Sequence, residues 1–172
     1  MNTIIIANAI ALIASIIMVL NGLIKDNKKV LASQCVQFTL SGIANFMLGG
    51  ITGTISNALS FVRNVYSIRK PMSMSIKVIL TIVQVGLSLY AGLNGWIDWL
   101  PIISNSIFTF TCDTDNRTFF KVSVMFTGAL WLFYDLHYLN FSSATFDVLA
   151  LISNTFTLIR LKHQSHLHQE LS

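Results

Sequence analysis

Long apolar runs alternate with short polar breaks along this chain, and the lengths of the runs predict helices. The helix that would cover 30–68 without a break is about 57 Å long at 1.5 Å per residue, too long for one membrane crossing of about 30 Å. The segment "MLGGITG" divides it, because its three glycines favour a turn. Seven apolar spans result, at approximately 4–24, 30–48, 51–68, 75–94, 99–112, 119–138 and 142–161. The pattern predicts an all-helical protein with seven transmembrane helices.

Composition places the chain in the membrane class. It is 53% hydrophobic and only 10% charged, and its mean hydropathy is +0.67. Soluble domains are typically about 25% charged. The net charge of +4 would suit nucleic acid, but the basic residues form no stripe or patch, so nucleic acid is excluded as a partner. Membrane lipid is the partner that the composition predicts.

The distribution of Lys and Arg predicts the orientation. With seven crossings, all eleven basic residues fall on the side opposite the N-terminus. Cytoplasmic loops carry the excess of Lys and Arg, so the N-terminus is expected outside and the C-terminus in the cytosol. No basic residue precedes the first apolar run, which is therefore interpreted as a retained helix rather than a signal peptide.

Two parts of the chain resemble each other. "DNK" at 26–28 matches "DNR" at 115–117 at an offset of 89, and at an offset of 90 Lys70 matches Arg160. The repeat predicts a three-helix unit over 1–70, a linker helix over 71–96, a second unit over 97–162 and a cytosolic tail over 163–172. Four crossings separate the two starts, so the units are parallel, as in some transporters whose sites lie between the repeats.

The polar residues within the repeated spans are the candidate chemistry. Asn57 and Asn64 match Asp147 and Asn154, and each pair is nearly two helical turns apart, on one face. One interpretation is hydrogen bonding between helices, and the other is a pocket for a small polar solute. Asp147 favours the pocket, because an ionisable residue within a span is a functional candidate.

Other polar groups have open interpretations. On the second helix, Gln34, Gln37, Ser41 and Asn45 form a continuous stripe that must face other helices or a cavity rather than lipid. Asp135 and His137 could form a proton-linked site, although exposed residues at the outer end of their helix are the favoured interpretation. The histidines of "KHQSHLHQE" are loosely spaced for a metal, and a solvated tail is expected.

The runs "LGGITGTISNALSFVRNVYSIRK", "WLPIISNSIF" and "FDVLALISNTFTLIR" resemble the YgjV-type bacterial inner-membrane protein family. The resemblance covers nearly the whole chain except the His-bearing tail, and it rests on small, Asn and Arg positions rather than on a catalytic signature. The family has no settled activity. The resemblance therefore implies a location in the bacterial inner (plasma) membrane and no particular function.

The three-one-three layout is also similar, more weakly, to the sugar-transporting SWEET proteins. In that family, asparagines on the third and seventh helices meet at a central pocket near tryptophans. The resemblance implies substrate-binding residues at Asn57, Asn64, Asp147 and Asn154, with Trp131 on the sixth helix. The first helix lacks a proline matching Pro101, whose expected counterpart is Leu12, and the Pro-Gln pair is absent, so sugar specificity does not transfer.

These observations predict a carrier or facilitator for an unidentified small polar solute, which works by rocking the two bundles about a midplane site. A non-transporting membrane protein, either a receptor-like binder or an assembly factor, is the alternative. The sequence has no nucleophile–base pair, Gly-rich phosphate loop or metal motif, so neither an enzyme nor a cofactor nor a metal site is expected. Homo-oligomerisation stays open.

Overall fold

A computed structural model describes the chain except for residues 1, 22–23, 25, 113, 115 and 171–172. The described residues form seven α-helices, one short 3₁₀ helix and no strand, which confirms the all-helical prediction. The helices are α1 (Asn2–Asn21), α2 (Asn27–Met47), α3 (Ile51–Arg69), α4 (Met74–Ala91), η1 (Trp96–Asp98), α5 (Trp99–Thr111), α6 (Arg117–His137) and α7 (Phe141–Glu170).

Corresponding helix ends recur 90 residues apart. The helices α2 and α6 begin at Asn27 and Arg117, and α3 and α7 begin at Ile51 and Phe141. Each of α2 and α6 begins after a side chain that caps it. The carboxylate of Asp26 accepts from the backbone N–H of Lys28 at 2.8 Å, and the amide oxygen of Asn116 accepts from that of Phe119 at 3.0 Å. The repeated "DN" segments are therefore N-terminal caps, which satisfy backbone donors that lack a partner within the helix.

The turns between α2 and α3 and between α6 and α7 share one geometry. Gly49 and Leu139 have positive φ values of 81° and 58°. The N–H of Gly50 donates to the carbonyl of Asn45, and that of Asn140 donates to the carbonyl of Asp135, both at 2.8 Å. A left-handed residue is a common helix ending that glycine adopts most easily, so Leu139 keeps it at some steric cost.

The constant offset of 90 corrects one expected correspondence. The helices α1 and α5 end at Asn21 and Thr111, also 90 residues apart, so Pro101 corresponds to Ala11 rather than to Leu12. The "DNK" and "DNR" match was made at an offset of 89. In the structure the capping residues Asp26 and Asn116 correspond instead.

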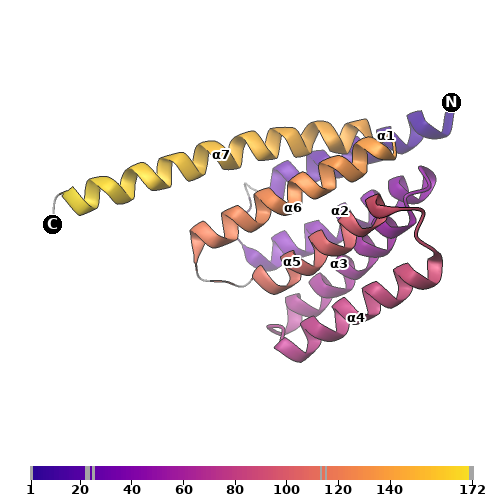
Figure 1. Ribbon diagram of the computed structural model, residues 1–172, viewed down its shortest axis with the longest axis horizontal. Helices are drawn as coiled ribbons and strands as arrows, with labels where there is room; N and C mark the ends of the chain where they lie inside the picture. Colours follow the sequence, from indigo (N-terminus) through magenta and orange to yellow (C-terminus); the bar gives the residue numbers. More distant parts are fainter. Residues whose placement is uncertain (1, 22–23, 25, 113, 115, 171–172) are drawn as a thin grey trace.

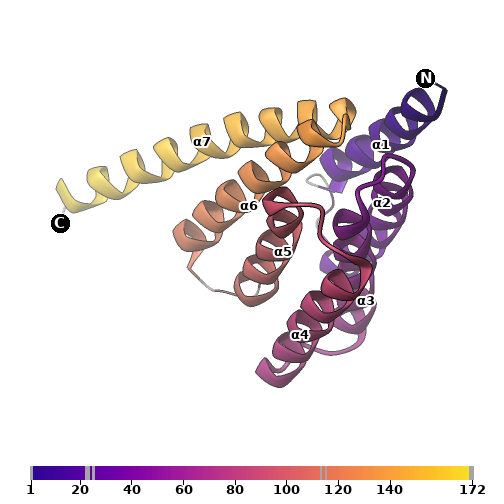
Figure 2. The same cartoon turned by 45° about the vertical axis from the view of Figure 1, so that its right-hand side comes forward.

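Six of the helices enclose an interior space. Consecutive helices pack within each half, α1 on α2 and α2 on α3, then α5 on α6 and α6 on α7. The halves meet where α1 packs on α7 and where α3 packs on α5. Figure 2 shows α1 to α4 on one side and α5 to α7 on the other, and α4 packs against α3 and α5. The C-terminal part of α7 projects beyond the other helices (Figure 1).

That projection bears on the expected tail at 163–172. The structure continues α7 as a helix to Glu170, and the side chains from 157 onward lie outside those described. The candidate metal ligands among the tail histidines therefore lie outside the described side chains as well.

The protein has an apolar surface and a polar interior. Large apolar side chains are widely exposed, among them Ile5 and Ile82 at 61% and 64%. The largest fully buried side chains include Gln84, Asn45 and Asn140. Water would favour the reverse arrangement, whereas hydrocarbon accepts an apolar surface and forces polar groups inward.

Among the described residues, three helices are long and apolar enough to cross a membrane by themselves: Asn2–Asn21, Met74–Ala91 and Phe119–His137. The helices α2, α3 and α7 are as long, but polar side chains lower their hydropathy, and α5 has only 13 residues. The polar residues that lower it lie largely on faces turned toward the other helices, as the interior cavity shows.

A polar cavity between the two halves

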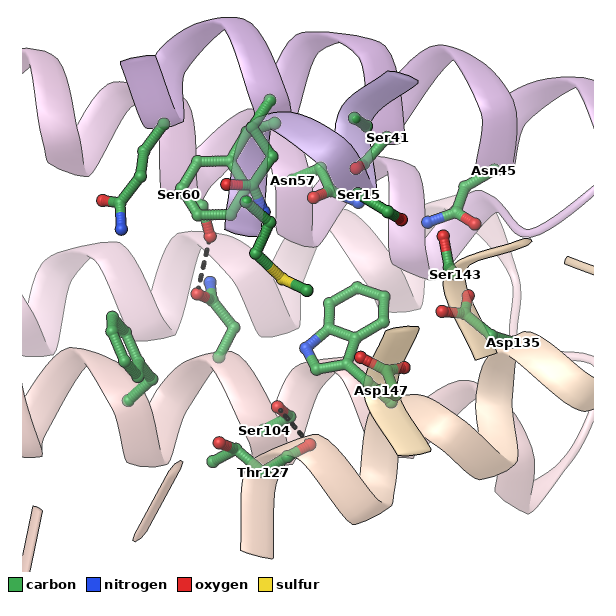
Figure 3. A pocket seen from close by; sticks show the side chains of 18 of the residues that line it. Ser15, Ser41, Asn45, Asn57, Ser60, Ser104, Thr127, Asp135, Ser143 and Asp147 are labelled. Atoms are coloured by element: carbon green, nitrogen blue, oxygen red, sulfur yellow. Dashed lines mark hydrogen bonds between the residues drawn. The ribbon is translucent and has the colours of Figure 1, made fainter. Parts of the chain in front are cut away.

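A cavity of about 320 Å³ lies inside the bundle, and every α-helix except α4 contributes to its wall. Near the turns that precede α3 and α7, Asn45, Asp135 and Ser143 gather at one end of it (Figure 3). Asn21, Gln34, Arg63 and Phe108 belong to the opposite end. We call these the Asp135 end and the Arg63 end of the cavity. Its volume is that of a small-molecule site rather than of a packing defect.

The cavity lies where corresponding positions of the two halves face each other. Most lining residues occur as pairs 90 positions apart, and the two members of a pair often differ in chemistry. Such pairs are Ser15 and Asn105, Gln37 and Thr127, Ser41 and Trp131, Asn45 and Asp135, and Asn57 and Asp147. At two of these pairs an amide in the first half corresponds to a carboxyl in the second, so the two halves of the lining match in position and differ in charge.

Of the predicted substrate-binding residues, Asn57, Asp147 and Trp131 line this cavity. Asn57 is 5% exposed, and its Nδ2 donates to the carbonyl of Gly53 in its own helix at 2.9 Å. Among the described residues its Oδ1 has no hydrogen-bond partner. The indole of Trp131 stands edge-on to the ring of Tyr134, with the ring centroids 5.6 Å apart.

Asn64 and Asn154 lie outside the cavity lining. Asn64 Nδ2 donates to Gln34 Oε1 at 2.8 Å, and Asn154 Oδ1 accepts from Lys121 Nζ at 3.0 Å. Both bonds join neighbouring helices, which is the alternative that the sequence left open. Seven residues advance a helix by about 10 Å. That step brings Asn64 to the level of Arg63, where it bonds to Gln34 instead of lining the cavity.

The polar stripe of α2 faces the interior, as predicted. Gln34, Gln37, Ser41 and Asn45 all line the cavity. Only part of their hydrogen-bonding capacity is used within the protein. Gln37 Oε1 accepts from Asn21 Nδ2 at 3.2 Å, and Asn45 Oδ1 accepts from Asn140 Nδ2 at 3.3 Å.

The favoured interpretation of Asp135 as an exposed residue was wrong. Its side chain is 4% exposed and lines the cavity, whereas His137, two residues further along α6, is exposed. Asp135 Oδ1 accepts from Asn140 Nδ2 at 3.2 Å, and Asp147 lines the same cavity. Asp147 Oδ2 is buried and has no hydrogen-bond partner among the described residues. Two residues turn a helix by about 200°, so these neighbours point in opposite directions.

Sequence reasoning also missed Arg63, which it counted with the cytosolic basic residues. Arg63 is 3% exposed, and its Nη1 donates to Asn105 Oδ1 at 3.0 Å and to Thr109 Oγ1 at 3.2 Å. The guanidinium lies 4.8 Å from the ring centroid of Phe108 and 5.9 Å from that of Phe38. Its hydrogen-bond partners in the described part of the chain are all neutral. Arg63 lies inside α3, six residues before the helix ends. Only the structure shows that its side chain is buried there.

Beyond the Asp135 end, a hydrogen-bonded group around Asp98 closes the bundle. Asp98 Oδ1 accepts from the hydroxyls of Thr52 at 3.1 Å and Tyr138 at 2.6 Å, and its Oδ2 accepts from the backbone N–H of Asn94 at 2.7 Å. Burial, together with the adjacent Asp98 carboxyl, raises the pKa of Tyr138 in the turn after α6 to about 12. Tyr138 therefore keeps its proton at neutral pH, and its hydroxyl donates a hydrogen bond to Asp98.

An apolar exterior around a cavity lined by polar side chains defines a helical membrane protein with a polar interior. Within that class, the chain belongs to the Imp-YgjV family of bacterial inner membrane proteins, whose family model matches residues 5–165. Neither the curated proteins nor the solved structures contain a significant match to the chain. The family assignment confirms the resemblance found in the sequence and places the protein in the bacterial inner membrane.

Proposed function

We propose that this protein is a carrier or facilitator for a small polar solute. The observation that carries the proposal is the cavity, lined by many polar side chains, between the two halves of an inner membrane protein. Asn57, Asp147 and Trp131 form part of the solute site, and the polar stripe of α2 provides the facing wall. Polar groups without protein partners in a buried cavity suit binding of a hydrogen-bonding solute. The lining offers binding groups rather than a nucleophile with its base, so transport is favoured over catalysis.

The same proposal includes a three-one-three architecture. Helices α1 to α3 form one three-helix unit, and α5 to α7 form a second unit parallel to it. All seven helices cross the membrane, and α4 joins the two units. The recurrence of helix ends at a 90-residue offset supports this division. So does the packing of α4 on α3 and α5, the two helices it connects in the chain. Transporters built from repeats move such units against each other about a central site.

The orientation proposed from the basic residues is also part of this function. The N-terminus lies outside and the C-terminus in the cytosol. The Asp135 end of the cavity then faces outward and the Arg63 end faces the cytosol. Rocking of one unit against the other would open these ends in turn.

Uptake into proteoliposomes tests the function. The purified protein is reconstituted and assayed for counterflow with a panel of radiolabelled polar metabolites. Ser41→Leu places a larger apolar side chain in the cavity and is expected to abolish uptake of any solute that the wild type carries. Ala32→Leu, on the exposed face of the same helix, is the matched control and is expected to transport normally. Absence of uptake for every solute, with correctly folded protein, would favour the receptor-like binder or assembly factor.

A further inference from the structure

The cavity carries opposite charges at its two ends. Arg63 lines one end, and its guanidinium is shielded from water and held by neutral partners. A buried cation without an anionic partner is costly, especially within a membrane. Among the described residues, Nη2 of Arg63 has no hydrogen-bond acceptor. A planar guanidinium with a free terminal nitrogen is suited to bind a carboxylate.

The Asp135 end is acidic. Asp135 and Asp147 both line the cavity, and two carboxylates that share a buried space repel each other unless a cation or proton lies with them. Asp147 Oδ2 is buried and has no partner among the described residues. No set of three or more His, Cys, Asp or Glu side chains gathers in the described part of the chain, so the pair is poorly equipped to hold a metal ion.

Further groups at the Asp135 end suit an organic cation. Asn45 and Ser143 add neutral oxygen atoms beside Asp135 (Figure 3), and the indole of Trp131 belongs to the same wall. Carboxylates, neutral acceptors and an aromatic face together are the groups that bind an ammonium ion.

The two charged ends are separated along the bundle. On α3, Arg63 lies six residues beyond Asn57, which corresponds to about 9 Å of helix. Asn57 is the counterpart of Asp147, so the acidic and basic groups lie at different depths. A solute that contacts both must carry its charges at opposite ends.

We propose that the solute is a small zwitterion, with its carboxylate at Arg63 and its ammonium group at Asp135 and Asp147. This inference rests on the proposed carrier function and specifies its substrate class. A neutral polar solute would leave Arg63 without an anion and the two carboxyl groups without a cation. A zwitterion places a charge of opposite sign at each end and adds no net charge to the membrane interior.

Four compounds of matched length test the proposal. They are 6-aminohexanoate, which carries both charges, hexanoate, hexylamine and neutral 1,6-hexanediol. Affinities are measured on the purified full-length protein by isothermal titration calorimetry. Since a hydrogen bond to a charged group is typically lost at a cost of about tenfold or more in affinity, 6-aminohexanoate is expected to bind at least about tenfold tighter than each of the others.

Two variants assign the ends. Arg63→Gln is expected to remove the advantage of 6-aminohexanoate over hexylamine and to leave its advantage over hexanoate. Asp147→Asn is expected to do the reverse. Asn154→Leu, outside the cavity, is the control and should leave both ratios unchanged. Each ratio compares ligands within one variant, so a general loss of stability does not alter it, and the wild-type ratios decide the proposal even if a variant fails to fold.

The outcomes separate this inference from the carrier function. Equal binding of 1,6-hexanediol and 6-aminohexanoate would overturn the zwitterion and leave a carrier of neutral solutes. Equal binding of hexanoate would overturn it in favour of a proton at the carboxyl pair. No binding of any of the four, with uptake of another solute in proteoliposomes, would also overturn it while the carrier function stands. No binding and no uptake of any solute would overturn both.

Discussion

Asn8 and Asp98, which correspond at the 90-residue offset, make matching contacts to the opposite half of the protein. Asn8 Oδ1 accepts from the backbone N–H of Ser142 at the start of α7 at 2.9 Å. Asp98 Oδ1 accepts from the hydroxyl of Thr52 at the start of α3 at 3.1 Å. Ser142 and Thr52 are themselves 90 residues apart. The first half therefore fastens its first helix, and the second half the turn that leads into its first helix, to the third helix of the other half.

The Asp98 contact is the stronger of the two, because a carboxyl group gathers three donors. Asp98→Ala removes them all and leaves the Thr52 hydroxyl and the Asn94 N–H without this acceptor in a site that is 2% exposed at Asp98. The expected loss is about 2–4 kcal/mol of unfolding free energy, measured by thermal denaturation in detergent. Asp26→Ala, which removes only an exposed helix cap, is the control and should cost about 1 kcal/mol. Equal effects of the two substitutions would contradict the role given to Asp98.

Gly53 is required where α3 passes close to Tyr134. The N–H of Gly53 donates to Tyr134 Oη at 2.8 Å, and a Cβ at Gly53 would lie 2.6 Å from a carbon of the same ring and 2.8 Å from Asn45 Nδ2. Gly53→Ala is expected to destabilise the protein by about 1–3 kcal/mol, because the ring and the amide must both move. The melting temperature in detergent measures the effect.

Gly86 provides the matched control for this substitution. It also lies within a helix, and a Cβ there would meet nothing within 4 Å. Gly86→Ala should leave the melting temperature unchanged or raise it slightly, because alanine favours the helix. A melting temperature for Gly53→Ala equal to that of Gly86→Ala would show that Tyr134 does not pack as described.

The sequence predicted the seven helices and their approximate bounds, because the length of an apolar run is set by local composition alone. It also identified the second-helix stripe, since a run of polar residues on one helical face has few alternatives within a membrane. The 90-residue correspondence of Asn57 with Asp147 was also visible, because polar residues stand out within apolar spans. In the structure both residues line the cavity.

The depth of a side chain in the bundle and the rotation of its helix could not be predicted from composition. Asp135 and His137 are adjacent in the pattern, but the rotation of α6 against α7 buries the first and exposes the second. Asn64 and Asn154 share a helix face with the cavity residues, but each is hydrogen-bonded to a side chain of a neighbouring helix and does not line the cavity. Arg63 was counted with the cytosolic cations although it lies inside the predicted span 51–68, because the sequence does not show whether its side chain turns toward water or into the bundle.

The proposed orientation has its own test. Green fluorescent protein joined after Ser172 should fluoresce, because it folds in the cytosol, and alkaline phosphatase at that position should be inactive. Alkaline phosphatase inserted beside Asn94, between α4 and α5, should be active. Active phosphatase at Ser172 would reverse the orientation and with it the assignment of the Arg63 end to the cytosol.

The last prediction separates solute binding from helix packing by means of two asparagines on corresponding helices. Asn57 lines the cavity, and its Nδ2 bonds only within its own helix at 2.9 Å, so Asn57→Leu removes little that joins helices. Asn154 accepts a bond from Lys121 on α6 and lies outside the cavity. Its replacement by Leu deprives an ammonium group of that acceptor.

Asn57→Leu is therefore expected to reduce solute uptake by about tenfold or more, with a change in unfolding free energy of about 1 kcal/mol or less. Asn154→Leu is expected to lower stability by about 1–3 kcal/mol and to leave uptake per folded molecule unchanged. Both quantities are measured on the same reconstituted preparations, with thermal denaturation for stability and counterflow for uptake. If Asn154→Leu abolished uptake without loss of stability while Asn57→Leu transported normally, the solute would lie nearer the end of the bundle than this cavity does.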